Sequence, residues 1–177
     1  MSQEDLQKEL TEHLRLIDEA RDKLGLAIGK FTMTFAALEA QADHAIWVFL
    51  RLPTSMVGQL LTGAIINVST RLNILESLVK GMRMEPGMEA NLCETVTAIR
   101  DMNAYRNWLV HDQWGAYQPN SGSWQKIRTR TDAKFHFQHK DFSAAEIDQQ
   151  TAACFGLRAK LSQQMSDYSR WRDAQPT

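Results

Sequence analysis

Residues 27–52 read AIGKFTMTFAALEAQADHAIWVFLRL, and this stretch decides the fold class that the sequence predicts. Its large apolar side chains recur at helical steps, so they share one face of an α-helix. These side chains are Phe31, Phe35, Leu38, Ala42, Ile46 and Phe49. Leu52-Pro53 ends the pattern, because the residue before a proline disfavours helical backbone. We therefore expect a central core helix here.

The segments on either side of this core helix also carry helical periodicity. Residues 3–24 repeat leucine and isoleucine among charges, which is typical of a surface helix, and Gly25 and Gly29 are places where it can bend. Ser143 and Glu146 form a capping box that opens a final helix. The further helices expected cover roughly residues 55–61, 70–80, 88–110 and 143–172.

Beyond residue 111 the apolar period changes from helical to two. Short strands are expected over roughly residues 114–117, 124–131 and 134–139, separated by turn-rich segments. The fold class expected is mainly α, an up-and-down bundle of about four to six helices with a small three-stranded antiparallel β-meander before the last helix. We expect one domain over residues 1–177, made of an N-terminal helix (1–26), a bundle core and motif helix (27–111), the meander (112–142) and a C-terminal helix (143–172).

Composition excludes several classes of protein. The net charge of -1 and the pI near 6.5 exclude binding of nucleic acid by overall charge alone, although a local basic patch remains open. Cys93 and Cys154 lie in apolar helical contexts and are expected to be reduced core residues. No apolar run approaches the length of a membrane span, and no phosphate-binding loop or metal-ligand cluster occurs, so a cytoplasmic protein without cofactor or metal is expected.

Polar residues interrupt the apolar pattern near the end of the helix expected over residues 88–110, where the chain reads Arg106-Asn107-Trp-Leu-Val-His111. Asn107 and His111 are four residues apart and share a face, while Arg106 lies about 100° round the helix from Asn107. A guanidinium binds phosphate through two parallel hydrogen bonds, and a helix C-terminus favours a protonated imidazole. The three residues therefore form a candidate phosphate-facing catalytic site.

A structural interpretation of the same residues stays open. Arg106 can pair with a carboxylate such as Glu39 or Asp43, which are four residues apart on the core helix. In that case His111 ends its helix as a satisfied histidine, Asn107 is a buried hydrogen-bond donor, and the tryptophans near the motif serve packing alone. The loss of Arg106 would then reduce stability and leave function intact.

The meander supplies candidate substrate contacts. Trp124, Lys126, Arg128 and Arg130 alternate onto one face of the second expected strand. An aromatic ring and three cations in a row suit a single-stranded RNA backbone. The same pattern also suits an exposed strand whose cations discourage edge-to-edge aggregation, and both interpretations stay open.

The Arg106-Asn107-x-x-x-His111 run, followed by Asp112-Gln113-Trp114-Gly115 and a strand, resembles the HEPN superfamily. The signature of that superfamily is an Arg, four to six residues and a His on a late helix of an α-helical bundle. The resemblance extends from about residue 28 to 165 and includes Gly29-Lys30-Phe31, Leu38-Glu39, Trp47 and Arg71-Leu72-x-x-Leu75.

The resemblance implies a metal-independent endoribonuclease that acts as a homodimer, in which the RNA 2′-hydroxyl attacks the adjacent phosphate. Arg106, Asn107 and His111 would carry the reaction. The expected supporting residues are Arg71 and, from their spacing on the core helix, Glu39 and Asp43, which could form an acidic wall to the Arg106 cleft or be solvated or ion-paired. The resemblance also implies a toxin or phage-defence setting with an antitoxin or regulatory protein as partner. Gln113 stands where one subtype carries a tyrosine that its antitoxin modifies. The alternative is a non-catalytic HEPN-fold module that binds RNA, a nucleotide or a protein at the same cleft.

Overall fold

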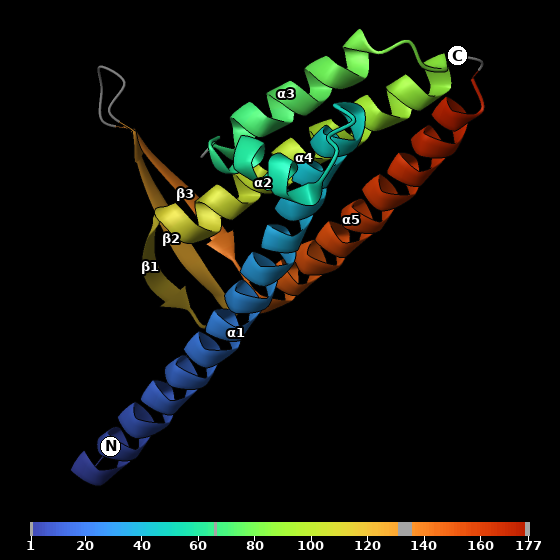
Figure 1. Cartoon of the computed structure of the whole chain (residues 1–177). Helices are drawn as coiled ribbons and strands as arrows, with labels where there is room; N and C mark the ends of the chain where they lie inside the picture. Colours follow the sequence, from blue (N-terminus) through green and yellow to red (C-terminus); the bar gives the residue numbers. More distant parts are fainter. Residues whose placement is uncertain (1, 66, 131–135, 176–177) are drawn as a thin grey trace. The chain divides into compact units, whose positions relative to one another are not determined.

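The structure, a computed structural model of the whole chain, describes residues 2–65, 67–130 and 136–175, with the backbone alone at 129, 130, 136 and 137. These residues form five helices and one antiparallel sheet of strand order β1-β2-β3 (Figure 1). The elements are α1 (Gln3–Phe49), α2 (Ser55–Gly63), α3 (Val68–Gly81), α4 (Pro86–His111), β1 (Gln113–Gln118), β2 (Ser123–Arg130), β3 (His136–Phe142) and α5 (Ala144–Asp173). The predicted class, mainly α with a three-stranded meander before the last helix, is confirmed.

The chain divides into two compact units. The helical unit comprises residues 33–106 and 151–177, and the sheet unit comprises residues 1–32 and 107–150. The boundaries fall inside α1, α4 and α5, so each of these helices contributes to both units. Composition signals no such boundary, because domain linkers are normally recognised by loop-forming residues.

In the helical unit, α1, α3, α4 and α5 form a bundle in which each helix contacts the next. Arg71 of α3 reaches Asp43 of α1, and Arg100 of α4 contacts Glu76 of α3. Further contacts join α4 to α5 through Glu94 and Lys160, and α5 to α1 through Tyr168 and Phe49. The buried core residues include Leu38, Ile46, Phe49, Leu72, Leu75, Leu92, Ile99 and Leu161. The helical stripes read from the sequence therefore meet in one core.

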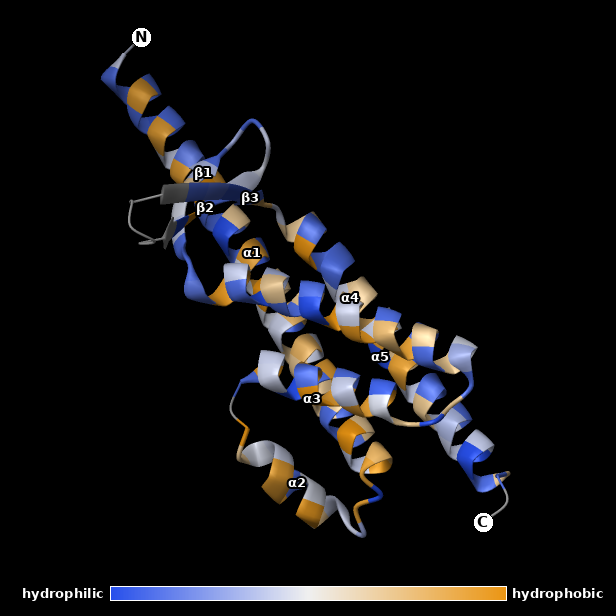
Figure 2. Cartoon of the chain, turned by 90° about the horizontal axis from the view of Figure 1, so that it is seen from above, coloured by the Kyte–Doolittle hydropathy of each residue, from blue (hydrophilic) through white to orange (hydrophobic). Residues whose placement is uncertain are grey.

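Helix α1 is a single helix from residue 3 to 49, whereas the sequence allowed a bend at Gly25 and Gly29. A glycine inside a helix costs only about 1 kcal/mol relative to alanine, which a long helix tolerates. The expected apolar face of residues 3–24 is not buried at its start, since Leu6, Leu10 and Leu14 are 50%, 59% and 53% exposed. Figure 2 shows these turns as apolar bands between hydrophilic ones at the N-terminal end of α1.

The sheet is fixed by its register and by the cap that follows it. Trp124 of β2 lies opposite Phe142 of β3, and Lys126 lies opposite Lys140. The Ser143 hydroxyl then accepts the backbone N–H of Glu146, which confirms the predicted start of α5. The side chains of 124, 126 and 128 take one face of β2, as the strand period requires.

Helix α2 packs on α1 through Gly58, where a Cβ atom would clash with the indole ring of Trp47. We expect Gly58→Ala to force the Trp47 indole out of position and to lower the free energy of unfolding by about 1–3 kcal/mol. Gly63→Ala is the matched control, because the same helix leaves open space at Gly63. That control should gain about 0.5–1 kcal/mol from helix propensity. Urea denaturation compares the two, and equal stability would contradict the packing.

Candidate functional site

The Arg106–His111 motif occupies the last turns of α4, and His111 is the final residue of the helix. The His111 side chain is exposed, while Arg106 and Asn107 are half-buried. Asn107 and His111 lie on one helix face, as predicted from their spacing. The boundary between the two units falls between Arg106 and Asn107. Arg106 therefore belongs to the helical unit, and Asn107 and His111 belong to the sheet unit.

Arg106 belongs to the helical unit, where the three supporting residues come together. Arg71 Nη1 lies 2.6 Å from Asp43 Oδ2, and its Nη2 lies 3.7 Å from Glu39 Oε2. The exposed fraction of the side chain is only 14% for Arg71, 16% for Asp43 and 22% for Glu39. We name Glu39, Asp43 and Arg71 the acidic cluster. Its ion pairs are shielded from solvent, so they interact more strongly than pairs on an open surface.

Both carboxyl groups of the acidic cluster are shifted toward the protonated form. Burial raises the pKa of Glu39, and the positive charges of Arg71 and then Arg106 oppose that rise. Burial likewise raises the pKa of Asp43 against the opposing effect of Arg71. Arg106 therefore lies within electrostatic reach of Glu39, as the structural interpretation of the motif expected. The protonation of both carboxyl groups therefore depends on their burial and on the neighbouring positive charges.

Two atoms of the acidic cluster are buried without a hydrogen-bond partner among the described residues. They are Asp43 Oδ1 and Arg71 Nε. A buried polar group without a partner costs about 1–3 kcal/mol, so such atoms mark a place where water or a ligand atom is accommodated. The cluster next to Arg106 is thus polar and incompletely satisfied.

His111 belongs to the sheet unit, where Lys126 of β2 closes the end of α4. Lys126 is fully buried, and its ammonium donates to the carbonyl oxygen of Leu109 at 2.8 Å and to that of Asp112. A cation at this position satisfies carbonyls that the helix end leaves open. It also supplies positive charge at the negative end of the helix dipole, beside His111.

Arg128 completes the attachment of the strand to the helix end. Its Nη2 lies 2.6 Å from Asp112 Oδ2, and its guanidinium lies 3.9 Å from the ring centroid of Trp108. The Lys126 ammonium lies 4.4 Å from the centroid of Trp114. Two cations, two rings and a carboxylate therefore hold the turn after His111 in a defined position.

Three of the expected substrate contacts on β2, namely Trp124, Lys126 and Arg128, are buried or half-buried in the structure. Lys126 has no exposed surface, and the Arg128 side chain keeps 19%. The Trp124 ring packs on Tyr117 with centroids 5.1 Å apart, and its indole N–H is buried. The side chain of Arg130 lies outside the described residues. The interpretation as a solvent-facing cationic strand is therefore wrong for Lys126, because the carbonyls of α4 take its hydrogen bonds.

No family model, curated protein or solved structure matches the chain. Among the residues that the structure describes, no three His, Cys, Asp or Glu side chains gather as metal ligands. None of the described helices combines the length and apolar character that crossing a bilayer requires.

Burial of Lys126 lowers the pKa of its ammonium to about 8. The folded protein then releases this proton at lower pH than the unfolded chain does, so the contribution of Lys126 to stability increases as pH rises from 8 toward 10.5. We expect the stability of the wild type relative to Lys126→Met to rise by about 2 kcal/mol between pH 7 and pH 10. Urea denaturation across that range measures the difference.

The matched control for Lys126 is Lys140→Met, which removes the lysine opposite it on β3. Lys140 keeps 39% of its side-chain surface. The control should follow the pH profile of the wild type. A pH-independent difference between the wild type and Lys126→Met would show that the buried ammonium does not titrate in this range.

Proposed function

We propose that the chain is a metal-independent endoribonuclease of HEPN type that acts as a homodimer. The observation that carries this proposal is the exposed His111 side chain at the end of α4, with Asn107 on the same helix face and Arg106 one residue earlier. A group that transfers protons to a substrate must be reachable, and His111 is. The resemblance of the sequence motif to the HEPN superfamily supports the same chemistry.

The proposed reaction forms a bond between the RNA 2′-oxygen and the adjacent phosphorus and breaks the bond to the 5′-oxygen. A neutral His111 takes the proton of the 2′-hydroxyl, and a protonated His111 of a second copy gives a proton to the leaving 5′-oxygen. Arg106 stabilises the negative charge of the phosphorane, and Asn107 orients the imidazole or the phosphate. The products are a 2′,3′-cyclic phosphate and a free 5′-hydroxyl.

The proposal of a homodimer has its own support. One motif provides one imidazole, while the reaction needs both a base and an acid. Leu6, Leu10 and Leu14 expose apolar surface at helical spacing on α1. Exposed apolar stripes of this kind are normally covered by a partner, and a second copy is the simplest one.

The neighbouring residues receive supporting roles in this proposal. The acidic cluster balances the charge of Arg106 through Glu39 and limits the directions in which the guanidinium extends. Lys126 and Arg128 hold the end of α4 through Leu109 and Asp112. We assign the protein to the cytoplasm, in a toxin or phage-defence setting with an antitoxin or regulatory partner, on the resemblance alone.

A second candidate is a non-catalytic module that binds RNA, a nucleotide or a protein partner at the same motif. The observation that favours it is the nearness of Arg106 to Glu39. A guanidinium whose charge is already balanced gives less stabilisation to a phosphorane than one held for that purpose. Binding of a ligand phosphate does not require the second imidazole.

The experiment that tests the proposal uses the purified dimer, labelled RNA and EDTA. The expected result is cleavage without added metal, with product ends that carry a cyclic phosphate and a 5′-hydroxyl. Intact RNA after prolonged incubation with a folded dimer would reject the nuclease and leave the binding module. Cleavage that EDTA prevents would reject the metal-independent mechanism.

A further inference from the structure

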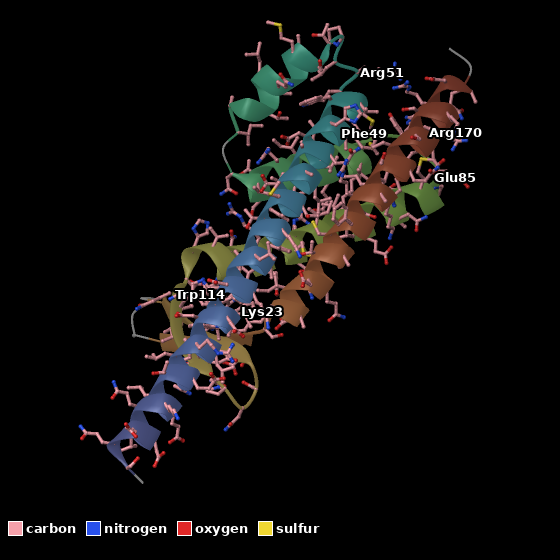
Figure 3. The ribbon with its side chains drawn as sticks, turned by 90° about the horizontal axis from the view of Figure 1, so that it is seen from below. Lys23, Phe49, Arg51, Glu85, Trp114 and Arg170 are labelled. Atoms are coloured by element: carbon pink, nitrogen blue, oxygen red, sulfur yellow. The ribbon has the colours of Figure 1, made fainter. Side chains whose placement is uncertain are left out.

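We propose that the helical unit holds a second ligand site, for a mononucleotide such as a nucleoside diphosphate, at the end where α1 stops. A cavity of about 940 Å³ lies there, lined among others by Arg51, Met82, Arg83, Tyr168, Trp171 and Arg172. Figure 3 marks this end of the unit by Phe49, Arg51 and Arg170. Ligand cavities commonly have volumes of about 300–1,000 Å³, so one nucleotide fits.

The cations of this cavity are available for phosphate. Arg51 and Arg83 are exposed and make no ion pair with any residue in the described part of the chain. Arg172 keeps its guanidinium near the Tyr168 ring and pairs with the adjacent Asp173 at 2.8 Å. Arginine binds phosphate oxygens in pairs, so two uncommitted guanidinium groups in one hollow suit a diphosphate.

The backbone at Arg51 closes the end of α1, since the Arg51 N–H donates to the Val48 carbonyl oxygen at 3.2 Å and the Leu52 N–H donates to that of Trp47 at 3.1 Å. Arg51 follows the end of α1 with a φ of 52°, the left-handed conformation that glycine adopts without penalty at helix ends. A side chain in this conformation costs free energy relative to glycine. The chain therefore places a strained arginine at a position where glycine would give a more stable helix end.

Trp171 is the ring of the cavity that suits a planar base, since the neighbouring Tyr168 is only 3% exposed. The ring centroids of Tyr168 and Trp171 lie 6.1 Å apart with an interplanar angle of 31°. The Tyr168 hydroxyl donates to the Met82 sulfur at 3.1 Å, which fixes that ring. Trp171 is half-buried and offers a face for stacking, an interaction worth about 1–3 kcal/mol per base in nucleic-acid complexes.

This site is separate from the motif of the proposed function. The cavity adjoins the start of α4 at residue 86, and Arg106 follows twenty residues later on the same helix. That separation corresponds to about 30 Å of helix. Nucleotide binding here therefore does not depend on RNA cleavage at His111, and either property can be present without the other.

The test measures binding of a fluorescent ADP analogue by anisotropy, with ADP, pyrophosphate and adenosine as competitors. We expect ADP to compete at least about 10-fold more strongly than pyrophosphate or adenosine, since each of these makes only part of the contacts. Arg51→Gly, Arg83→Gln and Trp171→Leu should each weaken binding by about 10-fold or more. The protein used is the full chain, without metal.

Arg51→Gly separates binding from folding, because glycine suits the backbone at this position and should leave the melting temperature unchanged or higher. Arg158→Gln on α5 is the charge-matched control and should bind like the wild type. No binding by the wild type, wild-type affinity of Arg51→Gly, or an equal loss in Arg158→Gln would each overturn the proposal. Stronger competition by a short RNA than by ADP would also overturn it, in favour of a nucleic-acid surface.

Discussion

Arg71→Met is expected to lower the free energy of unfolding by about 3–5 kcal/mol at pH 7, because it leaves buried carboxylates without their cation. Arg71 is the cation that contacts both Glu39 and Asp43 within the acidic cluster. Methionine fills a similar volume, so the loss reports the charge and not a cavity. Urea denaturation followed by circular dichroism gives the value.

The pH dependence of this loss identifies its cause. In the variant Asp43 loses the positive charge that opposes the rise of its pKa, and Glu39 keeps only that of Arg106. An acid whose pKa is higher in the folded state than in the unfolded state destabilises the fold above the folded pKa, and that cost disappears as pH falls through it. The difference between Arg71→Met and the wild type should therefore shrink from pH 7 to pH 5.

Two further variants serve as controls for Arg71→Met. Arg100→Met removes another cation between α3 and α4, but its pair with Glu76 is more exposed, so the loss should stay near about 1 kcal/mol. Adding Glu39→Gln and Asp43→Asn to Arg71→Met should recover most of the loss, since no buried charge then lacks a partner. A loss equal to that of Arg100→Met, or one that does not change with pH, would contradict the role of the acidic cluster.

His111→Ala is expected to reduce RNA cleavage by about 100-fold to 10,000-fold, the range for removal of a general acid or base. The proposed reaction uses the imidazole of one copy as base and that of the other as acid, so the substitution removes both. Because the His111 side chain is exposed, the variant should melt within a few degrees of the wild type. Cleavage is measured with EDTA present, at equal concentrations of folded protein.

His139→Ala is the matched control for His111→Ala, because it removes an exposed histidine from β3 in the same sheet unit. Its cleavage rate should equal that of the wild type. Mixed dimers test whether the site is composite, and they form by subunit exchange of equal amounts of wild type and His111→Ala. The activity should fall to about one quarter, and not to about one half, of that of the wild type alone at the same total protein concentration. Full activity of His111→Ala would exclude this histidine from the reaction.

The secondary structure was predictable because its signals are local. The stripe from Phe31 to Phe49 lies within one helix, and its core positions are buried as the period requires. Ser143 caps α5, and Thr54 accepts the backbone N–H of Val57 at the start of α2. Helix ends, strand period and caps depend on residues a few positions apart, so the sequence contains them directly.

The burial and the hydrogen-bond partners of the cations on β2 were not predictable in the same way. The alternation of β2 correctly put Trp124, Lys126 and Arg128 on one face, but period two does not say which face is covered. The ammonium of Lys126 binds a carbonyl oxygen 17 residues earlier, at the end of α4. The period of a strand does not reveal that its lysine lies opposite unpaired carbonyl oxygens at a helix end.

The sequence by itself determined the helices, the meander and the position of Arg106, Asn107 and His111 at a helix end, since backbone geometry converts spacing into faces. Only the tertiary structure decided which charges meet. Arg71 pairs with Asp43 across 28 residues, Lys126 donates to a carbonyl oxygen of α4, and His111 is exposed. The partner of each buried charge follows from packing, because a buried charge pairs with the polar group that the fold brings nearest to it.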